Sequence, residues 1–198
     1  MAAETSPEAA IAHIASQLRR LGTPFALVGG LAVSVRAEVR FTRDVDLAVD
    51  VDEDPSVERL VRELATVGYR ATALVEHEQR HRLSTVRLTS PSGVVVDLLA
   101  ASSGVESEIV ARAIVVPFDA AGLIPVARAE ELLAMKVLSM TDKRLQDRID
   151  AMSLVQSNPT LDLAAVRDVL HRITERGYHR DQDLLTKLET VLEAARAS

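Results

Sequence analysis

The chain contains no cysteine and no tryptophan, and aromatic residues make up only 3% of its 198 positions. Without cysteine, neither a disulfide scaffold nor a thiolate metal site such as a zinc ribbon is available. With so few rings, the core has to be built from Ala, Val, Leu and Ile. The scarcity of aromatic side chains also argues against a function in which exposed rings stack on nucleic-acid bases.

Excess positive charge and long apolar runs are also missing. Asp and Glu number 29 against 23 Lys and Arg, a formal net charge of −6, whereas a general nucleic-acid coat protein is basic. A local basic patch is compatible with this balance. No apolar run approaches the ~18 residues of a transmembrane helix, and the opening MAAETSPEAA lacks the regions of a secretory signal. The sequence therefore predicts a cytoplasmic protein that contacts no membrane.

The hydrophobic pattern changes about two-thirds of the way along the chain. Residues 1–125 are typical of mixed α/β structure with antiparallel pairing, and residues 126–198 are typical of a helical region. This predicts an α/β (α+β) fold class. Predicted helices begin near Ser6, Leu31, Asp54 and Arg128 and fill 144–156, 161–176 and 181–195; predicted strands cover 24–28, 45–51, 69–74, 83–89, 94–99 and 113–118.

Three aspartates fall where a charge is costly. Asp44 and Asp46 lie two apart beside an alternating segment, so a strand would point both to one face, about 7 Å apart. Like charges so placed repel each other unless a cation lies between them. Asp97 interrupts the apolar run 94–99, where an unpaired carboxylate is expensive to bury. A pair of Mg²⁺ ions, which bind carboxylate and phosphate oxygens, would remove both costs.

Gly29 and Gly30 close a short apolar strand and precede a predicted helix. Backbone N–H groups at such a turn, with the helix N-terminus behind them, can hold a polyphosphate. Glycine also lets phosphates approach the backbone closely. Together with the three aspartates, the turn predicts a site for a nucleotide and two metal ions. Two structural alternatives stay open: a Gly-Gly pair is more often a tight turn, and alternating acids are common on a solvated strand.

This order of motifs resembles the nucleotidyltransferase fold of the polymerase-β superfamily. It is closer still to the AbiEii-type nucleotidyltransferases, the toxins of type IV toxin–antitoxin systems, which include the MenT toxins. The resemblance runs from about residue 22 to 156. The residues that carry it are Gly29-Gly30, Arg40-x-Thr42-x-Asp44-Val45-Asp46, Leu132-x-x-x-Lys136 and Gln146-Asp147-Arg148-Ile149-Asp150, the last with Gln146 where an Arg is usual.

The resemblance implies a mixed, largely antiparallel sheet flanked by helices, with a C-terminal helical bundle that completes the active-site cleft. It also implies in-line displacement at the α-phosphate of an NTP, with pyrophosphate leaving. Asp44 and Asp46 would hold two Mg²⁺ ions, or Mn²⁺ in their place. Asp97 would share the metal that activates the attacking hydroxyl, directly or as general base. Gly29 and Gly30 would bind the triphosphate through backbone N–H groups.

The same resemblance assigns roles further along the chain. Lys136 would reach the phosphates as a point charge, although a lysine on an apolar helix face can also simply snorkel to solvent. Asp147 would orient the nucleotide or Lys136, whereas Asp150 is interpreted as structural. Arg40 and Thr42 would brace the metal-binding strand or touch phosphate.

The acceptor is less constrained than the reaction. The best-understood relatives add nucleotides to the 3′ end of tRNA and so block translation, usually beside an antitoxin. The cluster Arg80-His81-Arg82 with Arg87 is a candidate RNA contact, and its alternative is a solvated loop. A small hydroxylated molecule such as an aminoglycoside, or a protein side chain, is the alternative acceptor. A nucleotide- or partner-binding module without catalytic activity is the alternative class of function.

The histidines lack metal-ligand spacing, and His77 among them is expected on the surface.

Overall fold

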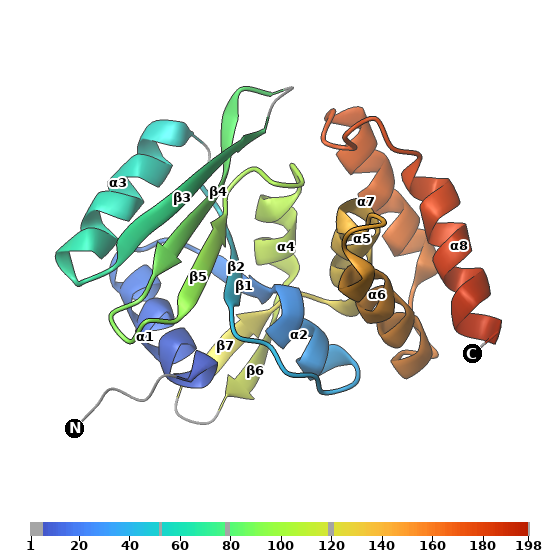
Figure 1. Ribbon diagram of the computed structural model, residues 1–198, viewed down its shortest axis with the longest axis horizontal. Helices are drawn as coiled ribbons and strands as arrows, with labels where there is room; N and C mark the ends of the chain where they lie inside the picture. The colour runs from blue at the N-terminus through green and yellow to red at the C-terminus, as the bar shows by residue number, and fades with distance from the viewer. Residues whose placement is uncertain (1–5, 52, 78–79, 119–120, 198) are drawn as a thin grey trace.

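The computed structural model describes residues 6–51, 53–77, 80–118 and 121–197 (Figure 1). A seven-stranded sheet and four helices precede a C-terminal group of four more helices. The strands are β1 (Phe25–Val28), β2 (Val45–Val49), β3 (Arg70–His77), β4 (Arg82–Thr89), β5 (Val95–Leu99), β6 (Ile114–Phe118) and β7 (Gly122–Val126). The helices are α1 (Pro7–Arg20), α2 (Gly29–Arg36), α3 (Asp54–Thr66), α4 (Glu106–Arg112), α5 (Ala129–Ser139), α6 (Leu145–Ser157), α7 (Leu163–Glu175) and α8 (Leu184–Ala197).

The sheet is mixed and mostly antiparallel, as predicted. Its strand order is β3-β4-β5-β2-β1-β7-β6. Four of the six strand pairs are antiparallel, and the β2–β5 and β1–β7 pairs are parallel. β2, the strand that follows Asp44, is therefore the central strand. A central strand is rigid because hydrogen bonds hold it on both edges, which suits a strand that carries site residues.

Most predicted elements are confirmed, and the helix starts show why. The Ser6 side chain accepts a hydrogen bond from the backbone N–H of Ala9, with Pro7 at the first helical position, the arrangement that satisfies a helix N-terminus. Two elements escaped prediction, the short helix α4 and the strand β7. The alternating segment also differs from expectation: β2 ends at Val49, and every residue in it except Asp46 is buried.

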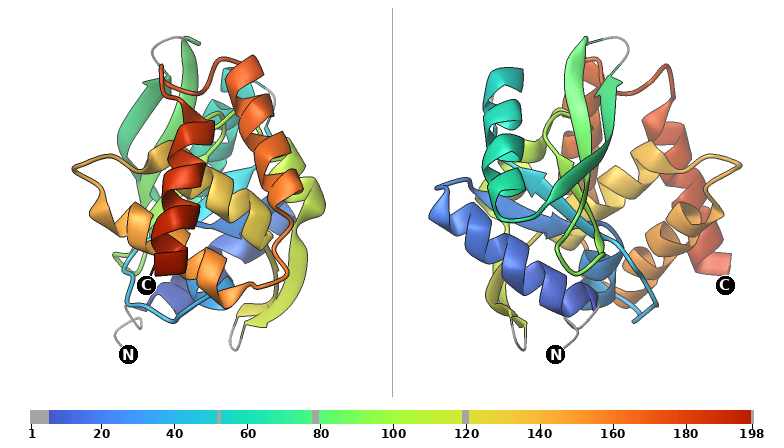
Figure 2. Two further views of the ribbon diagram at one scale, coloured as in Figure 1. Left: turned by 90° about the vertical axis from the view of Figure 1, so that its right-hand side faces the viewer. Right: turned by 60° about the vertical axis from the view of Figure 1, so that its left-hand side comes forward.

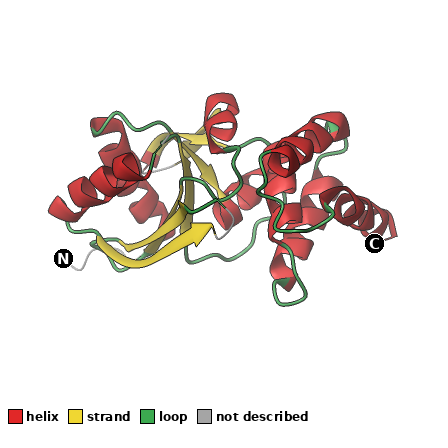
Figure 3. Ribbon diagram, turned by 90° about the horizontal axis from the view of Figure 1, so that it is seen from above, coloured by secondary structure: helices red, strands yellow, loops and turns green. Residues whose placement is uncertain are grey.

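The sheet lies between two groups of helices. Figures 1 and 3 show α1 and α3 on the left of the sheet and α5–α8 gathered on the right. All four residues of β1 are buried, and the core consists mainly of Ala, Val, Leu and Ile, as the composition predicts. None of the helices within the described residues is long and apolar enough to cross a membrane.

The C-terminal helices form one packed group that faces the sheet. α5 packs against α6 and α7, and α6 packs against α8, as the left view of Figure 2 shows. α5 is buried on most of its surface, including two charged residues, Glu131 and Lys136. Because α2 contacts both α5 and α6, the helix that follows the glycine turn joins this group to the sheet.

Candidate active site

The strand register brings three of the charged residues into one row. Asp46 on β2 is the direct neighbour of Asp97 on β5, and Asp97 is the direct neighbour of Arg87 on β4. Directly paired residues on adjacent strands point to the same face of a sheet. Two carboxylates and a guanidinium therefore lie side by side at the centre of the sheet, on strands that are far apart in sequence.

Asp46 and the glycine turn are in close contact. A Cβ on Gly29 would lie 1.9 Å from Oδ2 of Asp46, and Gly29 has a φ of +65°, so only glycine fits this position. The Gly30 backbone N–H donates a hydrogen bond to Asp46. Burial, the neighbouring Asp97 and Asp44 nevertheless raise the pKa of Asp46 to about 6. The charged form of Asp46 is therefore poorly compensated by the protein itself.

Asp97, in contrast, has a cation of its own. Arg87 Nε donates to one Asp97 oxygen at 2.9 Å and Nη2 donates to the other at 2.7 Å. Such two-point pairing is the strongest geometry for an arginine and a carboxylate, and it raises the pKa of Arg87 above its ordinary value. The Arg87 side chain is 49% exposed, so the pair is open to the cleft on one side.

A second group of charges surrounds Lys136. Its Nζ lies 2.8 Å from Oδ1 of Asp147 and 2.7 Å from Oδ2 of Asp150. Lys136 is thus buried and paired rather than snorkelling to solvent. Burial alone would raise the pKa of Asp150, but hydrogen bonds from Lys136, Gln146 and Arg40 hold it below its ordinary value. Asp150, which was predicted to be structural, is 1% exposed and accepts hydrogen bonds from all three of these side chains.

Arg40 and Thr42 connect that group to the glycine turn. Arg40 Nη2 donates to Asp150 at 2.9 Å, and its guanidinium passes directly over Gly30. A Cβ on Gly30 would lie 2.6 Å from Arg40 Nη2 and 2.9 Å from Thr42 Oγ1. Both residues therefore lie against the turn that contacts Asp46. The roles expected from the sequence, bracing the metal-binding strand or touching phosphate, stay predictions. Arg144 completes the group through Asp147, with its Nε 2.7 Å from Oδ2.

Asp46 and Asp97 open into a cleft of about 590 Å³. Arg87, Arg144 and Arg180 line the same cleft, so both signs of charge meet in it. Burial and the nearby Arg144 lower the pKa of Arg180, which shows that two guanidinium groups are held close enough to repel. An anion between them would relieve this repulsion.

The backbone at Arg180 is unusual. Arg180 and the next residue, Asp181, both have positive φ angles, of 55° and 56°. Non-glycine residues seldom adopt this conformation, and they cluster at functional sites when they do. The loop between α7 and α8 thus holds a strained backbone at the mouth of the cleft.

The loop after α7 is fastened to the sheet side of the molecule. Arg176 donates hydrogen bonds to the Gly104 carbonyl and to the Glu108 carboxylate. Arg180 Nη2 donates to the Ser102 carbonyl at 3.1 Å. A Cβ on Gly104 would lie 2.4 Å from the Tyr178 ring, so the loop sits directly on the chain that leaves β5. We name these contacts the C-terminal clasp: Ser102, Gly104 and Glu108 with Arg176, Tyr178 and Arg180.

The carboxylates of Asp44, Asp46 and Asp97 are chemically suited to bind a hard divalent cation. For Asp46, burial and the charges of Asp97 and Asp44 outweigh the opposing charge of Lys136 and raise its pKa. Carboxylate oxygens are the ligands that Mg²⁺ prefers. Among the described residues, however, no three His, Asp or Glu side chains converge as a formed metal site. The Asp97 oxygens already accept from Arg87, and Asp44 precedes β2 in the loop rather than lying within the strand.

Other candidate features lie outside the cleft. Of the predicted basic cluster, Arg87 faces the cleft, whereas Arg80 and Arg82 line a neighbouring hollow of about 390 Å³. His77 is buried, contrary to expectation, with its ring edge-on to Tyr178 at 4.7 Å. Tyr178 of the C-terminal clasp contacts only the His77 end of β3, whose other residues are exposed. Sequence alone gave no indication of that contact.

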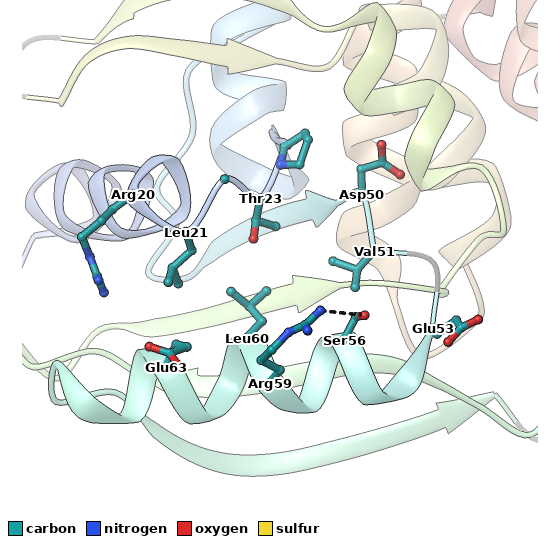
Figure 4. Close-up of a pocket in the computed structure, with 12 residues that line it drawn as sticks. Arg20, Leu21, Thr23, Asp50, Val51, Glu53, Ser56, Arg59, Leu60 and Glu63 are labelled. Carbon is teal, nitrogen blue, oxygen red and sulfur yellow. Dashed lines mark hydrogen bonds between the residues drawn. The ribbon is translucent and has the colours of Figure 1, made fainter.

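A hollow of about 730 Å³ lies between the end of α1 and α3. Figure 4 shows its lining, with Arg59 hydrogen-bonded to Ser56, the acidic side chain of Glu63 on the same helix and that of Glu53 just before it. None of the predicted site residues lines it. Its mixed, solvent-facing charges give it no chemistry comparable to that of the cleft.

Solved structures of known proteins share this fold. The chain resembles the structure of an antigenic nucleotidyltransferase-like protein from Paracoccidioides brasiliensis, at 17% identity, 94% coverage of each chain and a TM-score of 0.51. It also resembles ANT(2″)-Ia bound to adenylyl-2″-tobramycin, at 12% identity, 85% coverage of this chain and 97% of that one, and a TM-score of 0.50. At such identities these likenesses show the fold. A search of curated proteins found no match.

The family comparison goes further than the fold. Residues 15–197 match the family described as nucleotidyl transferase AbiEii toxin, type IV toxin–antitoxin system. This range includes the glycine turn, all three aspartates of the predicted site and the group around Lys136. The family resemblance seen in the sequence is therefore confirmed, and the chain belongs to the AbiEii family of nucleotidyltransferase enzymes, which use an NTP as substrate.

Proposed function

We propose that this enzyme transfers a nucleoside monophosphate from an NTP to the 3′ end of tRNA, with Mg²⁺ as cofactor, and thereby acts as a toxin that blocks translation. The observation that carries the proposal is the cleft itself. It combines a poorly compensated carboxylate, Asp46, with the guanidinium groups of Arg144 and Arg180. A metal-bound triphosphate and an RNA backbone both need this combination of charges.

Each site residue has a role that its contacts support. Asp44 and Asp46 would hold Mg²⁺, with Mn²⁺ as a substitute, and Asp97 beside them would share one ion. Bound there, the metal would neutralise charge on the attacking and leaving oxygens. Because Gly29 carries no side chain, the Asp46 carboxylate packs directly against the backbone at the start of α2, where the triphosphate would bind. The Gly30 N–H is already engaged by Asp46, so this backbone also orients the carboxylate.

The reaction balances with these groups. The acceptor hydroxyl oxygen forms a bond to the α-phosphorus, and the bond from that phosphorus to the bridging oxygen of the β-phosphate breaks. Pyrophosphate leaves, and the hydroxyl proton passes to the Asp97 carboxylate or to solvent. Lys136, held between Asp147 and Asp150, would present its charge to the departing phosphates. Both acids therefore act on the nucleotide through the lysine.

We also propose that residues 1–125 are the catalytic domain and that residues 126–198 complete its cleft. The support is the origin of the lining residues. Asp46, Arg87 and Asp97 come from the sheet, whereas Arg144 and Arg180 come from the helical group. Both parts therefore contribute charged side chains to the cleft. A cognate antitoxin is proposed as partner on the strength of the type IV family.

Label transfer tests the proposed function. The purified protein is incubated with Mg²⁺, each α-labelled NTP in turn, and total RNA. Label should appear in tRNA-sized bands with one preferred nucleotide, and both Asp44→Ala and Asp46→Ala should lower the rate by roughly 10²–10³-fold or more. Asp168→Ala, which removes an exposed acid from α7, is the matched control and should leave the rate unchanged.

The same experiment separates the alternatives. If RNA takes up no label while a hydroxylated small molecule or a protein does, the acceptor proposal is wrong and the transferase chemistry stands. Equal label transfer by Asp46→Ala and the parent protein would contradict the proposed metal site. Transfer that persists in the presence of excess EDTA would contradict the proposed Mg²⁺ requirement.

A further inference from the structure

Phe41 is the exception among the aromatic side chains. Phe25, Tyr69 and Tyr178 are buried, and Phe118 is partly buried. Phe41, in contrast, is 80% exposed. A chain with so few rings has placed one of them in water, where it contributes nothing to the core. Its position, three residues before Asp44, suggests a role in binding rather than in packing.

The backbone around Phe41 is held on both sides. Ser34 Oγ accepts a hydrogen bond from the Arg40 N–H at 3.2 Å, and Arg40 Nη1 donates to the Phe41 carbonyl at 3.2 Å. Arg40 is in turn paired with Asp150, and Thr42 lies against Gly30. The ring is thus presented from a fixed loop. A fixed ring loses little conformational freedom when a ligand covers it.

A guanidinium group already lies against one side of this ring. The Arg43 Cζ is 5.5 Å from the centroid of Phe41, within the range of a cation–π contact. Arginine and an aromatic ring are the two side chains on which nucleic-acid bases stack. The pair therefore forms a flat, cationic surface of the kind that binds a base next to a phosphate.

The Phe41 ring lines a groove that begins at the loop of residues 40–44, just before β2. The groove has a volume of about 650 Å³ and includes Asp44, whereas Asp46, two residues on, lines the main cleft. Its walls are largely apolar, from Leu31, Val94 and Val95. A volume of this order suits a small ligand. The walls fit an uncharged ring better than a phosphate, and their position leaves the phosphates of the same ligand at the aspartates.

We propose that Phe41 and Arg43 form a nucleobase-binding subsite, with the base stacked on the Phe41 ring and its sugar-phosphate directed to Asp44 and Asp46. The base belongs either to the incoming NTP or to the terminal nucleotide of the acceptor RNA. The inference rests on the proposed function, since it places one reactant of that reaction. The scarcity of aromatic side chains argues against stacking in general, but one exposed ring is enough to stack one base.

Tryptophan fluorescence gives a direct test, because the chain has no tryptophan of its own. Phe41→Trp keeps a stacking ring and makes it the sole tryptophan emitter. Each NTP alone, and tRNA alone, is titrated into this variant. Saturable quenching by NTP assigns the base to the nucleotide, and quenching by tRNA assigns it to the acceptor. Ribose 5-phosphate, which has no base, should not quench.

Leu123→Trp is the matched control. Leu123 is 62% exposed on β7. In the sheet, β1 separates β7 from β2, and β5 and β4 lie on the other side of β2. Its emission should not change with any of these ligands. Quenching of both variants to the same extent would reveal non-specific absorption or collision, and it would overturn the inference.

Kinetics provide the second measurement. Phe41→Ala should raise the KM of the reactant whose base stacks by roughly 5- to 100-fold, the equivalent of one lost base–aromatic stack, with a smaller effect on kcat. Phe41→Tyr should restore most of the loss, whereas Phe41→Leu, which is apolar but not aromatic, should not. Since the ring is exposed, these variants should unfold at the parent temperature.

The outcomes separate this inference from the proposed function. Normal label transfer with unchanged KM for both reactants in Phe41→Ala would overturn the subsite alone. Absence of transfer to RNA, with Phe41→Trp still quenched by an NTP, would support the subsite and overturn the tRNA acceptor. Absence of quenching by every NTP and by tRNA would overturn the subsite whatever the acceptor is.

Discussion

Two pairs of carboxylates, one on α6 and one on the sheet, differ in how well their charge is compensated. Asp147 and Asp150 on α6 share Lys136, and Arg144 and Arg40 add two more cations. On the sheet, Arg87 donates its hydrogen bonds to Asp97, and Lys136 only partly offsets the burial of Asp46. The pKa of Asp150 is accordingly lowered, whereas that of Asp46 is raised to about 6.

The difference indicates what each pair is for. A fully paired carboxylate group costs nothing further to keep charged, so the pair on α6 holds Lys136 and Arg40 in position. An under-compensated carboxylate is unstable until a cation arrives. The pair on the sheet can therefore bind a cation. Substitutions that unpair the charges on α6, and Mg²⁺ added to the carboxylates on the sheet, test this difference.

The largest effect is expected from Asp150→Ala. This change leaves Lys136 and Arg40 partly unpaired inside the protein, and breaking a buried ion pair in this way costs about 3–5 kcal/mol of stability. Urea unfolding followed by circular dichroism measures the loss. Asp147→Ala should lower the unfolding free energy clearly less. In that variant Lys136 is still paired with Asp150, and the Arg144 side chain, which is 59% exposed, can be solvated by water. Equal losses in the two variants would contradict the central place given to Asp150.

Asp46→Asn should change stability in the opposite direction. In the metal-free protein, the folded-state pKa of Asp46 is about 6 against an ordinary value of 3.8. At one pKa unit per about 1.4 kcal/mol, keeping Asp46 charged costs the fold roughly 3 kcal/mol at neutral pH. Removal of the charge should therefore raise the melting temperature at pH 7.5 in EDTA, even as it abolishes label transfer.

The pH dependence follows from the same shift. The folded state binds the Asp46 proton more tightly than the unfolded state, so this group lowers stability as pH rises from about 4 to 6 and adds no further change above that. The parent protein in EDTA should show this decline in unfolding free energy, and Asp46→Asn should show a smaller one. Identical pH profiles would mean that Asp46 is compensated in solution.

Added Mg²⁺ should restore part of that stability. A ligand that binds only the folded state at 100 times its Kd contributes about 2.7 kcal/mol, which for a chain of this size is several degrees in melting temperature. The shift is measured by thermal unfolding with and without Mg²⁺, at constant ionic strength set by KCl. Asp46→Asn should lose most of the shift, whereas Asp168→Ala should keep it.

The smallest effect is expected from Arg87→Ala. This change frees both Asp97 oxygens, so a cation that shares Asp97 should bind more tightly, by roughly 2- to 10-fold, the size of one partly exposed ion pair. The half-saturating Mg²⁺ concentration in the thermal assay measures it. An unchanged or weaker Mg²⁺ response would show that Asp97 serves to hold Arg87 and takes no part in metal binding.

Much of the fold could be predicted because its signals are local. The Ser6-Pro7 start of α1 and the apolar run of β1 each depend on a few adjacent residues. β7 was missed for a local reason too, since Pro125 interrupts its run and prolines are rare inside sheets. Its parallel pairing with β1 joins segments almost a hundred residues apart. α4, with seven residues, is too short for a helical period to be recognised.

The sequence could predict the candidate site as a set of residues, whose roles stay predictions, but it could not predict their contacts. The sequence motifs named the acids, the glycines, Lys136 and Asp147. The pairing of Arg87 with Asp97 depends on strand register, and the pairing of Arg40 with Asp150 spans 110 positions. Asp150 could have been included, since it lies three residues after Asp147 and so shares its helix face. Phe41 lies within the matched motif, but only its exposure sets it apart.

The C-terminal clasp has a consequence for the order in which the protein is made. Asp46 and Asp97 are synthesised well before Arg180, which lines the same cleft. Ser102 and Arg180 meet across 78 positions, so the loop cannot close over the sheet until residue 180 has left the ribosome. Until then, a growing chain carries only part of the cleft.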